Sequence, residues 1–216
     1  MTSVLSHMQR SLESLHDVKT ELDVEAYLID SEVRSEIPGA LFHVPEQLFV
    51  RDALDSCELA LYIDASILNA LKRDNPFKHL HAHNLEHFCV ALEGVSHFVL
   101  VAFCGNHGRC VSALEMEIQA EVDKFVMIWA MLIRQEGRFA ATRHMFEVLP
   151  QLFESYALHD GLSQNEIERY HAASLTARMY CYFLLQRYAD TPFGSSMKHH
   201  MRRFYRQDLC GKMCVG

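Results

Sequence analysis

The spacing of apolar residues predicts a chain made mostly of helices. Residues 3–16 place Leu5, Met8 and Leu12 at helical intervals, which indicates an amphipathic helix at the start of the chain. From residue 84 onward this periodicity continues almost without a break. It predicts four helical regions, at residues 84–104, 112–135, 138–158 and 163–188. The third contains Pro150, which is expected to interrupt it.

Capping residues mark where these helices begin. Asn84 is the predicted N-cap of the first helix. The sequences SALE (112–115) and SQNE (163–166) match the capping box, in which the first and fourth residues each bind the other's backbone N–H. The connection between the first two helices is short, so we expect them to form an antiparallel hairpin.

The N-terminal portion carries a different pattern. Residues 24–29 (VEAYLI) are expected to form a short strand, and residues 47–51 and 57–63 alternate apolar and polar positions, which predicts a β-hairpin. Asp64 then caps a short helix over 65–73. The predicted fold class is therefore mainly α: a helical bundle of about four long helices (84–188), preceded by a small β-hairpin and short helices. We expect a single domain over residues 1–216, with 1–78 as the N-terminal portion and 195–216 as a basic C-terminal tail.

Polar residues form stripes on three of these apolar helices. Glu93 and His97 share a face of the first helix, and the second helix carries a matching stripe. In the predicted hairpin, His97 lies near Glu117 or Glu121, and Glu93 lies near Lys124. A third stripe follows in the last helix. The sequence thus predicts a buried polar network made of Glu93, His97, Glu117, Glu121, Lys124, Glu168, His171 and Arg178.

The same residues support an alternative, a metal site inside the bundle. Carboxylate and imidazole ligands suit iron, manganese or zinc, and Glu168 and His171 have the Glu-x-x-His spacing of di-iron bundles. Such bundles use two of these motifs and the chain has one, so the network without a metal or cofactor is favoured. The candidate ligands of the alternative are Glu93, His97, Glu121, Glu168 and His171.

A histidine-rich segment, HLHAH, precedes the first long helix. His79, His81 and His83 alternate, and three imidazoles on one side of an extended segment can ligate zinc. No cysteine or acidic residue lies among them in the sequence. We therefore expect a helix entry and no metal site there.

Net charge and composition limit the classes of partner and the compartment that we expect for this protein. The net charge of −8 argues against a nucleic-acid partner, except through the basic tail, whose predicted partner-binding cations are Lys198, Arg202, Arg203 and Arg206. No signal peptide or membrane-spanning segment is recognisable, which predicts a cytoplasmic protein. The odd count of seven cysteines fits a reducing compartment. It leaves the role of Cys210 and Cys214 open.

Catalytic motifs are absent from the sequence. It contains no nucleophile elbow, phosphate-binding loop, C-x-x-C or H-E-x-x-H motif. The function favoured is therefore binding, as an accessory or regulatory module with a protein partner, and not catalysis. The alternative is a non-haem metal-dependent oxidoreductase, and the oligomeric state stays open.

Overall fold

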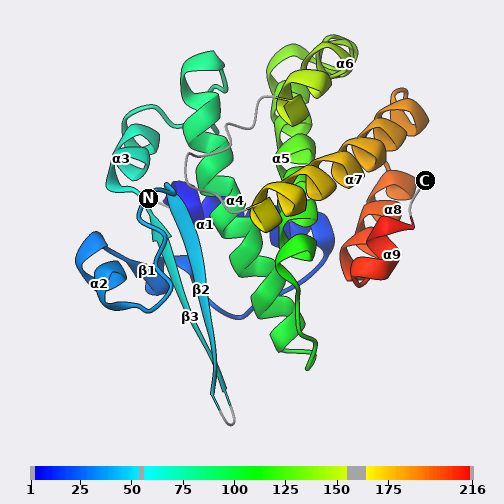
Figure 1. The fold of residues 1–216 in the computed structure, drawn as a ribbon. Helices are drawn as coiled ribbons and strands as arrows, with labels where there is room; N and C mark the ends of the chain where they lie inside the picture. Colours follow the sequence, from blue (N-terminus) through cyan, green and yellow to red (C-terminus); the bar gives the residue numbers. More distant parts are fainter. Residues whose placement is uncertain (1–2, 54–55, 155–163, 215–216) are drawn as a thin grey trace. The chain divides into compact units, whose positions relative to one another are not determined.

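The computed structural model describes residues 3–53, 56–154 and 164–214, and it is mainly α-helical with a small three-stranded sheet (Figure 1). This confirms the predicted fold class. The chain divides into two compact units: Met1–Ser14 with Val18–Cys110, and Leu15–Asp17 with Val111–Gly216. The first of the four predicted long helices therefore belongs to one unit, and the other three belong to the second.

The first unit is built on a sheet in which β3 is the central strand. Its elements are α1 (Val4–His16, whose last turn is counted with the second unit), η1 (Val24–Tyr27), β1 (Leu28–Ile29), α2 (Ser31–Glu36), β2 (Glu46–Ala53), β3 (Ser56–Ile63), α3 (Ala65–Arg73) and α4 (Ala82–Gly105). The hairpin predicted from alternation is β2–β3, in antiparallel register, and β1 pairs with β3 in parallel. Asp64 caps α3, as predicted, by accepting from the Ser66 N–H.

The strand predicted over residues 24–29 is wrong for most of its length. Only Leu28 and Ile29 pair with β3, and the preceding four residues form the 3-10 turn η1. The Asp23 side chain accepts a hydrogen bond from the Glu25 N–H, and this cap begins a tight turn where the apolar pattern suggested extended chain.

The start of α4 also differs from the prediction. The N-cap is His81, and Asn84 is the third residue of the helix. Asn84 Oδ1 accepts from the His81 N–H at 3.0 Å, while its amide nitrogen donates to the His79 carbonyl at 2.9 Å. Asn84 therefore stabilises the start of the helix from its first turn. Its side chain accepts from the N-cap N–H, as the fourth residue of a capping box does.

Helix α4 packs against the sheet and α3 with almost its whole circumference apolar (Figure 1). By length and composition it is the helix, among those described, that could cross a membrane, yet 67% of its most apolar window is buried within the structure. Gly94 is the point of closest approach to the sheet. A Cβ there would lie 2.8 Å from Glu46 Oε2 and 3.0 Å from Leu61 Cδ1.

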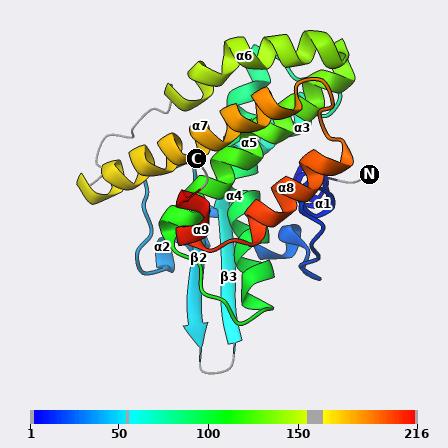
Figure 2. The same ribbon diagram turned by 90° about the vertical axis from the view of Figure 1, so that its right-hand side faces the viewer.

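The second unit is built around α5 (Ala113–Glu136). Helices α6 (Arg138–Glu154), α7 (Gln164–Tyr188) and α9 (Leu209–Met213) contact it, and α8 (Ser195–Arg206) precedes α9 (Figure 2). Ser112 caps α5 as predicted, by accepting from the Glu115 N–H. Ser163, the first residue of the predicted SQNE capping box, lies outside the described residues. Residues 155–158, the end of the third predicted helix, lie outside them as well.

The predicted interruption at Pro150 is wrong. Helix α6 runs through Pro150 to Glu154 without interruption. Leu149 and Phe153, on either side of the proline, are each 4% exposed, and their burial offsets the missing backbone hydrogen bond. The basic tail contains the helix α8, which buries Met197, Met201, Phe204 and Tyr205 on one face.

We predict that Gly94→Ala destabilises the first unit by about 1–3 kcal/mol, because the added methyl group overpacks the contact between α4 and the sheet. Gly105→Ala is the matched control, since a Cβ at this position of the same helix has no neighbour within 4 Å. Chemical denaturation of both variants measures the free energy of unfolding. Equal stability of Gly94→Ala and Gly105→Ala would contradict the close approach.

Candidate binding groove

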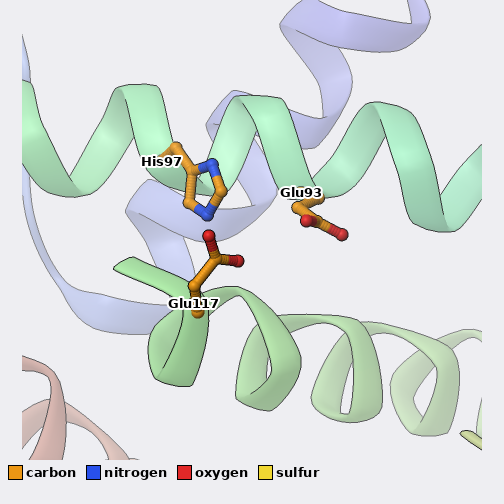
Figure 3. Close-up of side chains that lie close together, drawn as sticks. All are labelled: Glu93, His97 and Glu117. Carbon is orange, nitrogen blue, oxygen red and sulfur yellow. The ribbon is translucent and has the colours of Figure 1, made fainter. Parts of the chain in front are cut away.

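The polar residues predicted on α4 lie together. Figure 3 shows Glu93 and His97 on successive turns of the helix. Their candidate ligand atoms lie within 4.8 Å of each other. His97 is buried and Glu93 is half-buried. Glu117, also labelled in Figure 3, is carried by α5 of the second unit, where it is buried. Two of the five candidate metal ligands therefore share one helix face of the first unit.

On α5, Lys124 pairs with a residue of its own helix. Its Nζ lies 2.6 Å from Glu121 Oε1, and the two side chains are 15% and 19% exposed. The predicted contacts across the hairpin, His97 with Glu117 or Glu121 and Glu93 with Lys124, join residues of different units and stay predictions.

The third predicted stripe is on the surface. Glu168, His171 and Arg178 are exposed on α7, so they do not belong to a buried network. Helix α7 instead buries the opposite face, which carries Ala173, Ala177, Tyr180, Cys181 and Leu184. The sequence misled because Leu175, Met179 and Tyr182 make the exposed face look apolar as well.

A different polar cluster is fully buried in the second unit. Lys212 on α9 is 0% exposed, and its Nζ donates to Gln119 Oε1 at 2.6 Å and to the Phe204 carbonyl at 3.0 Å. The Gln119 amide donates to Asp123 Oδ1 at 2.9 Å, and His16 Nε2 lies 2.7 Å from the same oxygen. The cluster of His16, Gln119, Asp123 and Lys212 thus satisfies a buried ammonium and a buried carboxylate together, as burial of either charge requires.

Sequence analysis missed this cluster. Gln119 and Asp123 are four residues apart on an apolar helix, which was the available signal. Their partners are 93 and 107 residues away in the chain, and no periodicity connects positions so distant. Lys212 stands in a short C-terminal segment with no apolar pattern long enough to predict burial.

Two arginines of the predicted partner-binding tail have an internal role. Arg206 donates to the carbonyls of His16 and Asp17 at 2.9 and 2.8 Å, and Arg202 donates to the carbonyl of Leu15 at 3.3 Å. These carbonyls stand at the C-terminal end of α1, where helices leave acceptors unsatisfied and favour cations. Arg202 and Arg206 therefore bind backbone carbonyls of the same unit, whereas Lys198 and Arg203 are exposed without such a contact among the described residues.

The exposed face of α7 carries large apolar side chains. Leu175, Met179, Tyr182 and Phe183 are 62%, 52%, 47% and 39% exposed, and we refer to these four residues as the apolar stripe. Their spacing places them along about two turns of the helix, a length of roughly 12 Å from Leu175 to Phe183. Neighbouring exposed apolar side chains of this kind are a feature of interaction sites.

The stripe forms one wall of a groove with a volume of about 650 Å³. Helices α8 and α9 supply the opposite wall. The groove is lined by Met179, Tyr182, Phe183, Gln186, His200, Arg203, Phe204, Gln207, Gly211 and Cys214. Aromatic and methionine side chains thus surround a small number of polar groups, the composition typical of binding sites.

The polar groups at the aromatic end of the groove are electrically neutral. Tyr180 stacks on Phe204 with ring centroids 3.8 Å apart, and its hydroxyl lies 3.0 Å from His200 Nδ1. Burial raises the pKa of Tyr180. Burial, with Arg203 and His199 nearby, lowers the pKa of His200. At neutral pH the tyrosine hydroxyl and the imidazole are therefore both uncharged.

The two C-terminal cysteines lie one turn apart on α9, where the Cys214 N–H donates to the Cys210 carbonyl. Both are exposed and free, and Cys214 lines the groove. The neighbouring Cys214 raises the pKa of the Cys210 thiol, and Asp208 adds a smaller effect in the same direction. Cys210 is therefore a neutral thiol at pH 7, unlike the activated thiolate of a catalytic cysteine.

Comparison with known proteins gives no relative. No family model, no curated protein and no solved structure matches this chain. Any function must therefore be argued from the residues themselves.

We predict that Lys212→Met lowers the free energy of unfolding of the second unit by about 1.5–3 kcal/mol, because it leaves Gln119 and the backbone acceptors without a charged donor. Hydrogen exchange at the α9 amides should also accelerate. Lys198→Met is the control: Lys198 is exposed, and surface substitutions usually stay within about 0.5 kcal/mol. A Lys212→Met protein that melts like the wild type would show that the ammonium reaches water.

Proposed function

We propose that the protein acts by binding another protein, as an accessory or regulatory module, and that the α7–α9 groove is the contact surface. The observation that carries this proposal is the apolar stripe: four large apolar side chains are exposed side by side on one helix face. Burying them against a partner removes apolar area from water, which is the main favourable term in protein association.

The groove favours a helical segment of the partner. The stripe repeats at intervals of four, three and one residues, so it follows one face of α7 for about two turns. An amphipathic helix laid alongside covers such a stripe along its whole length. A small molecule in the groove would leave Leu175 exposed, because Leu175 lies one turn beyond the lining residues.

A second copy of this chain fits the groove less well. A symmetric dimer would place the same lining on both sides of the interface. That lining contains Arg203 and no carboxylate, so two copies would bring equal charges together without a counter-ion. Like charges brought together in this way oppose association.

We predict that a displayed library of amphipathic helical peptides enriches on the wild-type protein, and that Met179→Lys weakens the selected peptides at least about tenfold, as expected for a central apolar contact. Phe139→Lys is the matched control, because Phe139 is 75% exposed but lies on α6, outside the groove. Affinities are measured by fluorescence polarisation, after circular dichroism has confirmed that each variant is folded.

Two outcomes would contradict the proposed function. One is a library that yields no binder, or binders that Met179→Lys and Phe139→Lys weaken equally. The other is a wild-type dimer, seen by light scattering, that Met179→Lys converts to a monomer, since the occupant of the groove would then be a second copy.

The metal-dependent alternative has one supporting observation, the proximity of Glu93 and His97 on α4. Its other ligands do not support it, because Glu168 and His171 are exposed on α7. We therefore expect elemental analysis of the purified protein to find no stoichiometric iron, manganese or zinc. Stoichiometric metal that is lost in both Glu93→Gln and His97→Gln would favour the alternative.

A further inference from the structure

We infer that the helix bound in the groove is acidic, with carboxylates beside its apolar face, and that Arg203 is the residue that selects them. This inference rests on the proposed function, because it names the chemistry of the segment that would occupy the same groove. Three observations lead to it: the charges of the residues that line the groove, the hydrogen bonds that the neighbouring arginines make to backbone carbonyls, and the exposure of Arg203.

The lining carries a single sign of charge. Arg203 is its one cation at neutral pH, since His200 is uncharged there, and none of the ten lining residues is a carboxylate. The field of the Arg203 guanidinium extends into the groove and is screened by salt, because this side chain is exposed. A bound carboxylate gains from this field, and a bound ammonium is repelled by it.

Arg203 is available, unlike the other arginines of α8. Arg202 and Arg206 bind backbone carbonyls of Leu15, His16 and Asp17. Arg203 has no ion-pair partner within residues 3–53, 56–154 and 164–214, and its side chain is exposed. A guanidinium presents two parallel N–H donors to a carboxylate, which gives the contact geometric as well as electrostatic selectivity.

The position of Arg203 fits the edge of a bound amphipathic helix. On α8 it lies about 100° from Phe204, whose buried ring forms part of the apolar wall. A ligand helix that buries its apolar side chains between α7 and α8 would direct the polar residues at its border toward Arg203. Acidic residues at those border positions are therefore the complementary choice.

The test uses the full chain and a peptide library with a constant apolar face, in which the border positions are randomised among charged and neutral polar residues. Selection on the wild type should enrich Asp and Glu at the border, and selection on Arg203→Gln should not. For a selected peptide, replacing the border Glu by Gln should weaken binding about three- to fivefold in low salt, the range of an exposed ion pair. That difference should shrink in 0.5 M salt.

Lys198→Gln is the control variant. Lys198 is also an exposed cation of α8, but it does not line the groove and lies about 140° around the helix from Arg203. The acidic preference should survive this substitution. Its loss in both variants would show that net charge alone attracts the peptides, and would overturn the assignment to Arg203.

The remaining outcomes separate the inference from the proposed function. Peptides that bind with no acidic preference, or with a preference that Arg203→Gln leaves intact, overturn the inference and leave the proposed function standing. A library that yields no binder overturns both. Displacement of a selected peptide by an equal concentration of dodecanoate would assign the groove to a small amphiphile, and would overturn the inference as well.

Discussion

The buried ammonium of Lys212 is the contact on which the second unit depends. It joins α9 to Gln119 of α5 and to the end of α8. Gln119 in turn donates to Asp123, whose carboxylate also contacts His16. Each charge in this cluster would be costly to bury alone. Together they hold the short helix α9 against α5. Because Gly211 on that helix and Cys214 at its C-terminal end line the groove, the shape of the groove follows from the same contact.

The arginines of α8 show how one helix can serve two purposes. Its buried face packs through Met197, Met201, Phe204 and Tyr205. Arg202 and Arg206 reach the carbonyls at the end of α1, and Arg203 alone among these arginines lines the groove. Helical geometry thus divides this basic run into arginines that bind backbone carbonyls and an arginine that lines the groove.

The buried polar cluster and the exposed apolar stripe of the second unit have different roles. The cluster around Lys212 is closed to solvent, with all four side chains at most 1% exposed, and it holds the fold together. The apolar stripe of α7 has the opposite character, because it leaves large side chains in water where a polar face would be expected. A partner that covers these four side chains would explain this departure from the usual pattern.

The sequence by itself determined the elements and the broad class of the fold. Apolar periodicity located the long helices, alternation located the β2–β3 hairpin, and Ser112 and Asp64 marked helix starts, because these signals depend on residues close together in the chain. Which polar residues are buried was decided only by tertiary structure. Glu168 and His171 form as regular a stripe as Glu93 and His97, yet α7 buries its other face. Lys212 and His16 meet α5 across about half the chain length, and local pattern holds no information about contacts between such distant residues.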